Sequence, residues 1–145
     1  MTARFLVAAA ALALGACALF RPHPHPPEYS SLALGSGVVV HDLVVPEEGA
    51  PVASGDTVAI HYELYVENQL VESSRDAGKP LRIVLGKDDV PEGLQQGILG
   101  MRLFGRRRII VPPELAYGDD GKPPLIPPDA TLTFEIELME HVPAP

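Results

Sequence analysis

The sequence contains no tryptophan and a single cysteine, Cys17, among its 145 residues. One cysteine excludes a disulfide within the chain, so an ordinary hydrophobic core must stabilise the fold. Basic residues are also scarce: 11 Lys and Arg stand against 19 Asp and Glu, and the formal net charge is −8. Because nucleic acids and anionic membrane surfaces attract positive charge, this balance argues against both as partners.

The usual signatures of covalent and metal-dependent catalysis are missing as well. The sequence has no G-x-S-x-G motif, no H-E-x-x-H motif, no C-x-x-C pair and no P-loop. We therefore expect no metal and no cofactor. The length leaves room for one hydrophobic core and hence one folded domain.

The N-terminus has the composition of an export signal. Met1–Leu14 carries one cation, Arg4, and no acid. Its apolar run, Phe5–Leu14, is too short to span a bilayer and fits a signal peptide instead.

The run ends in Leu14-Gly15-Ala16-Cys17, which resembles the bacterial lipoprotein box. In that class the cysteine becomes the new N-terminus and carries acyl chains. An ordinary signal peptide with a chance cysteine is the alternative. Because the only cysteine falls at this position, we expect residues 1–16 to be a lipoprotein signal peptide and Cys17 to be lipidated. Ala18 stands where an aspartate would mark inner-membrane retention, which favours the outer membrane of the bacterial envelope, on the periplasmic side.

Residues 17–35 are predicted to be a tether rich in proline and histidine. Four prolines between residues 22 and 27 favour an extended, polyproline-like spacer. His23 and His25 could form a weak metal site, but no further ligand lies nearby, so we interpret them as solvated linker residues. The folded domain is expected at residues 36–142, followed by a tail at 143–145.

Most of that domain alternates as half-buried strands do. In Thr57–Val66 one face carries apolar side chains and Tyr62, and the other is mostly polar. Residues 132–138 repeat the pattern, with Phe134 on the inward face. Further strands are predicted at residues 37–45, 70–74, 81–85 and 105–111.

One short helix is predicted between the strands at 81–85 and 105–111. Asp88 or Asp89 can cap it, and Pro91 suits its opening because the missing N–H would be unpaired there. Its apolar face is formed by Leu94, Ile98 and Met101.

Glycines at positions 93, 97 and 100 weaken that helix by about 1 kcal/mol each relative to alanine. Their presence indicates close packing against a sheet. The fold class is therefore α+β, with five to six antiparallel strands around one short helix.

The segment Pro112–Asp129 is too rich in proline and glycine for a helix or a ladder strand. Irregular loops of this length are usually functional or disordered. Because it carries apolar side chains, we predict an ordered flap that presents Tyr117, Leu125 and Ile126 to a pocket beside the final strand.

Five blocks of residues 37–142, in order, resemble the FKBP family of peptidyl-prolyl isomerases: Val58–Leu64, Glu72–Lys87, Glu92–Met101, Arg107–Gly118 and Ile126–Leu138. The family fold is a twisted antiparallel sheet wrapped around one helix, with the active pocket between them. The resemblance implies an enzyme that accelerates X–Pro isomerisation, with proline-containing polypeptides of the cell envelope as clients. We expect a monomer.

The resemblance also implies the pocket residues. Positions that act on the substrate fall on Tyr62, Glu72, Tyr117 and Phe134, and Tyr117 stands where the family tyrosine donates its hydroxyl to a carbonyl. The remaining substrate-binding positions fall on Val71, Leu81, Val90, Pro91, Leu94, Leu125 and Ile126. Tyr62 and Phe134 could also be plain core aromatics, since inward parity does not separate the two roles.

The sequence departs from the family pattern in the pocket. Leu94 replaces the tryptophan beneath the proline ring, and Val71 and Leu81 replace wall phenylalanines; such changes remove apolar contact. Glu72 is one methylene longer than the usual aspartate. Pro91 has no N–H to offer a ligand, a loss of about 0.5–1.5 kcal/mol. We expect a weakened isomerase that binds macrolide inhibitors poorly.

Two alternatives stay open at this point. An FKBP-like module could bind proline-bearing clients without catalysis, or a structural lipoprotein could fill the pocket with its own side chains. Arg106–Arg108 are interpreted as solvated and ion-paired strand residues, and His61 and His141 are assigned no chemistry.

Overall fold

The structure is a computed structural model that describes residues 30–145. The predicted signal peptide, Cys17 and most of the predicted tether lie outside these residues. In order, the elements are β1 (Ser31–Ala33), β2 (Val39–Val44), β3 (Thr57–Val66), β4 (Gln69–Ser73), β5 (Leu81–Val84), α1 (Glu92–Ile98), β6 (Arg106–Val111), a short 3-10 helix (Pro113–Leu115) and β7 (Leu132–Val142).

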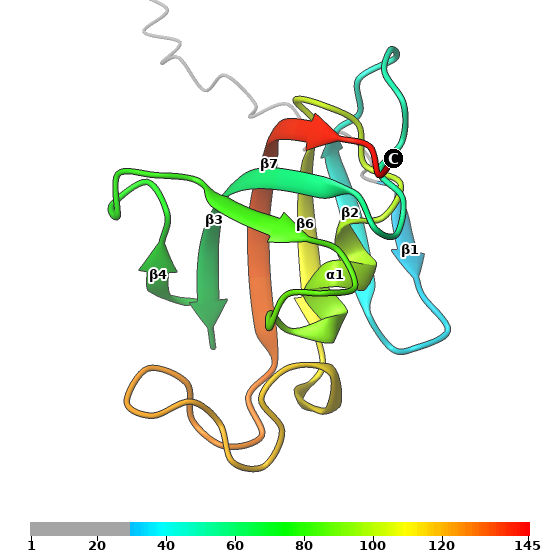
Figure 1. Cartoon of the computed structure of the whole chain (residues 1–145). Coiled ribbons are helices and arrows are strands. Elements are labelled where there is room, and N and C mark those ends of the chain that lie inside the picture. Colours follow the sequence, from blue (N-terminus) through cyan, green and yellow to red (C-terminus); the bar gives the residue numbers. More distant parts are fainter. Residues whose placement is uncertain (1–29) are drawn as a thin grey trace, which may run out of the picture.

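The strands form one antiparallel sheet in the order β1-β2-β6-β7-β3-β4, with β5 paired to β3. α1 packs against one face of this twisted sheet (Figure 1). The predicted α+β class and the single helix are confirmed, although the sheet has seven strands rather than five or six. No helix among residues 30–145 is long and apolar enough to cross a membrane.

β1 is the strand that the sequence did not predict, and it corrects the domain boundary. Ser31–Ala33 pair with Val39–His41, and the Ser31 hydroxyl lies 2.7 Å from Nδ1 of His41. The strand has only three residues and all are exposed, so it carries no hydrophobic period. The predicted C-terminal boundary of the tether at residue 35 is therefore wrong, because residues 31–35 belong to the folded domain.

The predicted capping of α1 is also wrong. No side chain caps this helix, and Pro91 occupies the N-cap position. The Asp88 carboxylate instead accepts a hydrogen bond from the Val84 N–H at 2.7 Å, which closes the turn after β5. Leu94 and Ile98 are buried on the helix face that meets the sheet, as predicted.

The helix lies unusually close to β6, as its glycines predicted. A Cβ atom at Gly93 would lie 2.3 Å from Val111 Cγ1, and one at Gly97 would lie 2.4 Å from Ile109 Cγ2. Ile109 and Val111 are fully buried. Glycine at both positions is therefore a packing requirement.

Asp56 joins the turn before β3 to the C-terminal end of β7. Its buried carboxylate accepts from the backbone N–H groups of Ala53 and Ala144, each at 2.8 Å, and lies 2.7 Å from His141 Nε2. The hydrogen bond from Ala53, followed by those from His141 and Ala144, lowers the Asp56 pKa from 3.8 to about 2.

We predict that Gly97→Ala lowers the free energy of unfolding by about 1–3 kcal/mol, because the added methyl overlaps Ile109 and must displace helix or strand. Gly35→Ala is the matched control, since no atom lies within 4 Å of a Cβ at that position. Chemical denaturation of both variants measures the difference. Equal effects of the two substitutions would contradict the packing argument.

Because the Asp56 pKa is lower in the folded state, its carboxylate stabilises the fold above about pH 4, and this contribution is lost as the pH falls towards 2. We predict that Asp56→Asn destabilises the protein at neutral pH and that its difference from wild type shrinks between about pH 4 and pH 2. Urea unfolding across that range checks this, with the exposed Asp76→Asn as control. A difference that does not vary with pH would refute the linkage.

Candidate active site

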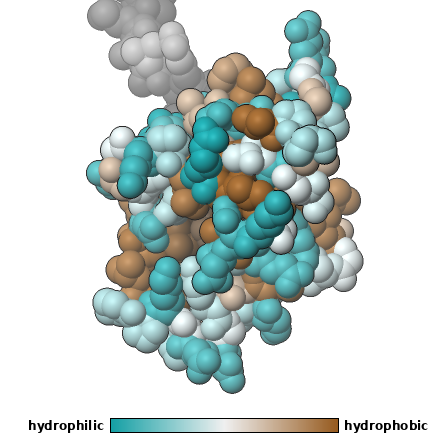
Figure 2. Space-filling view, viewed as in Figure 1, coloured by the Kyte–Doolittle hydropathy of each residue, from teal (hydrophilic) through white to brown (hydrophobic). Residues whose placement is uncertain are grey.

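A cavity of about 190 Å³ lies between α1, the sheet and the loop that precedes β7. Pockets that bury a drug-sized ligand typically measure about 300–1,000 Å³, so this cavity suits a single ring or side chain. Figure 2, in the view of Figure 1, shows hydrophobic surface among hydrophilic side chains. The lining residues are Tyr62, Leu64, Glu72, Leu81, Asp89, Val90, Pro91, Leu94, Tyr117, Lys122 and Phe134.

The structure brings eight of the predicted site residues together in this lining: Tyr62, Glu72, Leu81, Val90, Pro91, Leu94, Tyr117 and Phe134. Three predicted residues lie elsewhere. Val71 is half-buried against the core, Ile126 is buried within it, and Leu125 is half-exposed. Lys122 and Ile126 form an isolated β-bridge that closes a turn through residues 123–125. Leu125 lies in this turn and is half-exposed, whereas Ile126, the bridge residue after it, is buried.

Three lining residues were missed from the sequence. Leu64 shares the inward face of β3 with Tyr62, so its parity could have indicated it. Asp89 adjoins Val90 just before α1, and Lys122 lies in the irregular loop. No periodicity exists in such segments, so the sequence carried no signal for Asp89 or Lys122.

Aromatic and leucine side chains form the apolar part of the cavity. Tyr62 on β3 and Phe134 on β7 come from paired strands, and their ring centroids lie 6.3 Å apart with the rings inclined by 56°. This tilted arrangement is typical of favourable aromatic pairs. Leu94 is 2% exposed and closes the cavity on the helix side.

The two tyrosines of the cavity differ in what their hydroxyls do. Tyr62 donates to the Glu72 carboxylate. Burial, and then this hydrogen bond and the Glu72 charge, raise the pKa of Tyr62 well above its ordinary value. Among residues 30–145 the Tyr117 hydroxyl has no hydrogen-bond partner, although it lines the cavity. Tyr117 is therefore the hydroxyl that can donate to a bound group.

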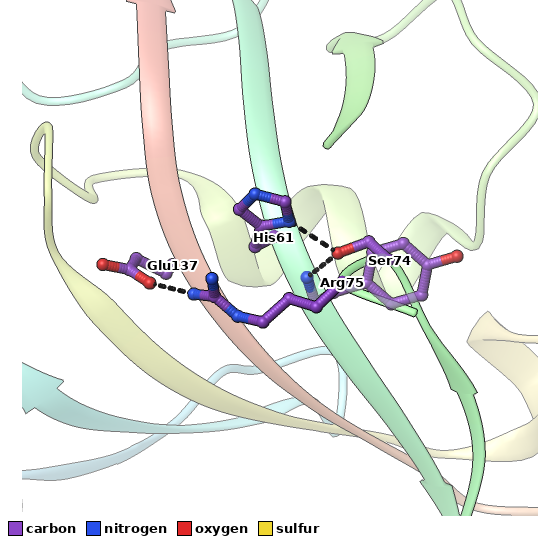
Figure 3. Close-up of polar contacts among 5 residues, drawn as sticks. His61, Ser74, Arg75 and Glu137 are labelled. Atoms are coloured by element: carbon purple, nitrogen blue, oxygen red, sulfur yellow. Dashed lines mark hydrogen bonds and ion pairs between the residues drawn. The ribbon is translucent and has the colours of Figure 1, made fainter. Parts of the chain in front are cut away.

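Ser74 holds the backbone of Tyr62 at a gap in the sheet. β4 and β5 pair with opposite ends of β3, through residues 63–66 and 57–60, which leaves Tyr62 between them. The Ser74 hydroxyl accepts the Tyr62 N–H at 2.8 Å, and the Ser74 N–H donates to the Tyr62 carbonyl at 3.0 Å. Figure 3 shows the same hydroxyl beside His61, whose Nδ1 lies 3.0 Å away.

Charged side chains on the outer face of the sheet pair with one another. Arg75 bonds Glu137 across the strands (Figure 3), and Arg108 lies 2.6 Å from Glu135. The expected ion pairing of the arginine cluster is thus confirmed for Arg108. Arg107 lies on the opposite, helix-facing side of β6, where it pairs with Asp42 at 2.6 Å and donates to the carbonyls of Gly97 and Leu99.

The loop that carries Tyr117 is ordered by its own hydrogen bonds. The Gly118 N–H donates to Pro113 at 2.8 Å, and Lys122 and Ile126 exchange backbone bonds of 2.8 and 3.0 Å. A Cβ at Gly121 would lie 2.6 Å from the Ile126 carbonyl oxygen, so a side chain there would break this closure. The loop fixes Tyr117 over the cavity, as expected for an ordered flap.

No group of three His, Cys, Asp or Glu side chains in the described part of the chain could hold a metal ion. No histidine of residues 30–145 lines the cavity, so these residues provide no hydroxyl–imidazole pair there. The imidazole of His61, which contacts the Ser74 hydroxyl, lies on the other side of β3. What the arrangement offers is a partly open cavity that combines apolar side chains, one hydroxyl donor without a partner among residues 30–145, and three charged side chains.

Comparison with known proteins gives one consistent result. The family profile of the FKBP-type peptidyl-prolyl cis-trans isomerases matches residues 49–139. The chain is 42% identical over 86 residues to peptidyl-prolyl cis-trans isomerase FKBP1A of Xenopus laevis, covering 59% of this chain and 80% of that protein. It is 37% identical over 107 residues to an FK506-binding protein of Neisseria meningitidis serogroup B, covering 72% of this chain and 95% of that protein.

Solved structures agree with the sequence relatives. The structure of AtFKBP13 matches with a TM-score of 0.69 and 35% identity over 76% of this chain and 97% of that one. FkpA from Escherichia coli matches with a TM-score of 0.71 and 32% identity over 82% of this chain, but only 55% of FkpA is covered.

The contact between Tyr62 and Glu72 gives a spectroscopic prediction. Glu72→Gln should lower the Tyr62 pKa, because it removes the carboxylate charge that disfavours a phenolate, while burial keeps that pKa above its ordinary value. Alkaline titration with ring-labelled tyrosine and NMR detection measures it. Glu63→Gln is the matched control, since Glu63 accepts from Tyr65 and raises the pKa of Tyr65 to about 12. A Tyr62 titration that Glu72→Gln leaves unmoved would contradict the assignment.

Proposed function

Since the chain belongs to the family of FKBP-type peptidyl-prolyl cis-trans isomerases, which are enzymes, we propose that its cavity accelerates X–Pro isomerisation. We propose further that this acceleration is weaker than in family members with an aromatic cavity base. The observation that carries the proposal is the cavity itself, which combines the Tyr62–Phe134 pair, a closed apolar base at Leu94 and the free hydroxyl of Tyr117.

The reaction needs shape rather than a reactive group. Amide resonance imposes a barrier of about 18–20 kcal/mol on rotation about the bond. As the bond twists, the C–N bond loses double-bond character and the carbonyl oxygen loses charge. A site that fits the twisted amide and excludes water binds the transition state more tightly than the ground state. Phe134 and Leu94 are 3% and 2% exposed, so most of each side chain is packed against other residues of the protein.

The base of the cavity supports the reduced rate. Leu94 presents a branched aliphatic surface where a flat ring would cover more of a proline. Pro91 has no N–H, so the chain lacks a donor at the start of α1 where a bound carbonyl could be gripped. The small cavity volume also favours a single proline over a large macrolide inhibitor.

The setting and clients are proposed from the sequence. The lipoprotein-like tetrad ending in Cys17 supports a lipid anchor on the periplasmic side of the bacterial envelope, with the outer membrane favoured by Ala18. Two or more acyl chains give stable anchoring without any basic patch, which suits a formal net charge of −8. The proposed clients are proline-containing polypeptides of that compartment, and we propose that the protein acts as a monomer without a cofactor.

A second function is favoured by the same two residues. With Leu94 and Pro91 in place of a ring and a donor, the domain could hold proline-bearing clients without accelerating their isomerisation. The two functions differ in one measurable quantity, the isomerisation rate.

We predict that Leu94→Trp raises kcat/KM on a Leu-Pro or Phe-Pro peptide by roughly tenfold, the equivalent of about 1.4 kcal/mol of transition-state stabilisation. Leu99→Trp is the matched control, because Leu99 is 41% exposed and does not line the cavity. The measurement is an isomerisation assay on wild type and both variants.

Wild-type acceleration that increases only with Leu94→Trp supports the proposal. If wild type is silent and Leu94→Trp restores the rate, the cavity binds without catalysis and the second function stands. If no protein accelerates the peptide, the enzyme proposal is overturned.

A further inference from the structure

Three charged side chains line the cavity and come from three different segments. Glu72 lies on β4, Asp89 lies just before α1, and Lys122 lies in the loop that carries Tyr117. Within residues 30–145, none of the three takes part in an ion pair. No oppositely charged side chain of the described residues therefore neutralises them.

Lys122 is held at the donor side of the cavity. Its Nζ lies 5.4 Å from the centroid of the Tyr117 ring, within the distance of a cation–π contact. The backbone bonds between Lys122 and Ile126 fix the Lys122 main chain. A positive charge thus stands over the ring of the tyrosine whose hydroxyl can donate to a bound carbonyl.

The acidic side chains near the cavity, unlike Lys122, make no recorded contact with Tyr117. The Glu72 carboxylate already accepts the Tyr62 hydroxyl, and Asp89 comes from the segment that leads into α1. Asp119 and Asp120 share the loop with Lys122, but both are exposed and neither lines the cavity. The charged side chain of the lining that contacts Tyr117 is therefore Lys122.

We propose that Lys122 gives the enzyme a preference for an acidic over a basic residue immediately before the proline. This inference rests on the proposed function. The carbonyl of the isomerising bond belongs to the residue before the proline, and Tyr117 carries the hydroxyl available to that carbonyl. Because the Cβ of that residue is only two bonds from the carbonyl carbon, we place its side chain near Tyr117, where Lys122 attracts a carboxylate and repels a cation. Lys122 acts as a specificity residue and takes no part in the bond rotation.

The test uses the full chain and three peptides that differ only before the proline, which is preceded by Glu, Gln or Lys. The measured quantity is the ratio of kcat/KM for the Glu-Pro peptide to that for the Lys-Pro peptide, in an assay without a coupling protease. Lys122→Met removes the charge and keeps the side-chain length, and Lys122→Glu reverses the charge. Lys87→Glu is the matched control, because Lys87 is exposed, does not line the cavity and gives the same change in net charge.

We expect a wild-type ratio above one that falls about two- to fivefold with Lys122→Met, the range of exposed ion pairs, and further with Lys122→Glu. The wild-type ratio should approach one when the ionic strength rises from about 0.01 M to about 0.15 M, because salt screens exposed charges. Lys87→Glu should leave the ratio at its wild-type value.

Two results would overturn the inference, and they are distinguishable from failure of the proposed function. If all peptides are accelerated but the ratio is the same in wild type, Lys122→Met and Lys122→Glu, the isomerase stands and the role of Lys122 is refuted. That role is also refuted if Lys87→Glu changes the ratio as much as Lys122→Glu does. If wild type accelerates none of the peptides, the proposed function fails and the inference fails with it.

Discussion

The close contact between α1 and β6 is the constraint on which the cavity depends. Gly93 and Gly97 bring the helix backbone against Val111 and Ile109, with no room for even a Cβ between them. Protein interiors are packed to the density of organic crystals, so a larger residue there would have to move the helix. With the helix held at this distance, Leu94 closes the cavity opposite Phe134.

The polar groups of the cavity divide into fixed and available ones. Tyr62 is tied at three points: its hydroxyl to Glu72, and its N–H and carbonyl to Ser74. Tyr62 is therefore a rigid part of the cavity wall, and its hydroxyl is not available to donate to a bound ligand. Tyr117 is held by its loop, its hydroxyl has no partner among residues 30–145, and Lys122 adds a charge over its ring. A rigid apolar surface with one preorganised donor suits a reaction whose transition state is recognised mainly by shape.

The sequence predicted features that repeat along the chain. Alternation located β3 with its bounds and placed Tyr62 and Phe134 on the inward face, and the helix glycines indicated a close approach to the sheet. It did not predict β1, because three exposed residues have no period, nor the role of Ser74, whose partner Tyr62 is reached only across the sheet.

Most residues of the cavity lining were expected from the family resemblance, and the lining differs from that expectation in the irregular segments. Leu125 and Ile126 were taken together, but Leu125 lies half-exposed in a turn, whereas Ile126, in the β-bridge that closes this turn, is buried in the core. Lys122 and Asp89 could not be found from the sequence because their position depends on how two irregular segments fold over the helix and sheet.

The measurement that tests the account most directly is exchange NMR on a Leu-Pro peptide mixed with a small amount of the isotope-labelled protein. It reports the cis–trans exchange rate of the peptide and the amide signals of the protein in one sample. The account predicts faster exchange together with signal changes centred on Tyr62, Leu94 and Tyr117. Faster exchange with changes confined to another face, or changes at the cavity without faster exchange, would contradict the claim that this cavity isomerises proline bonds.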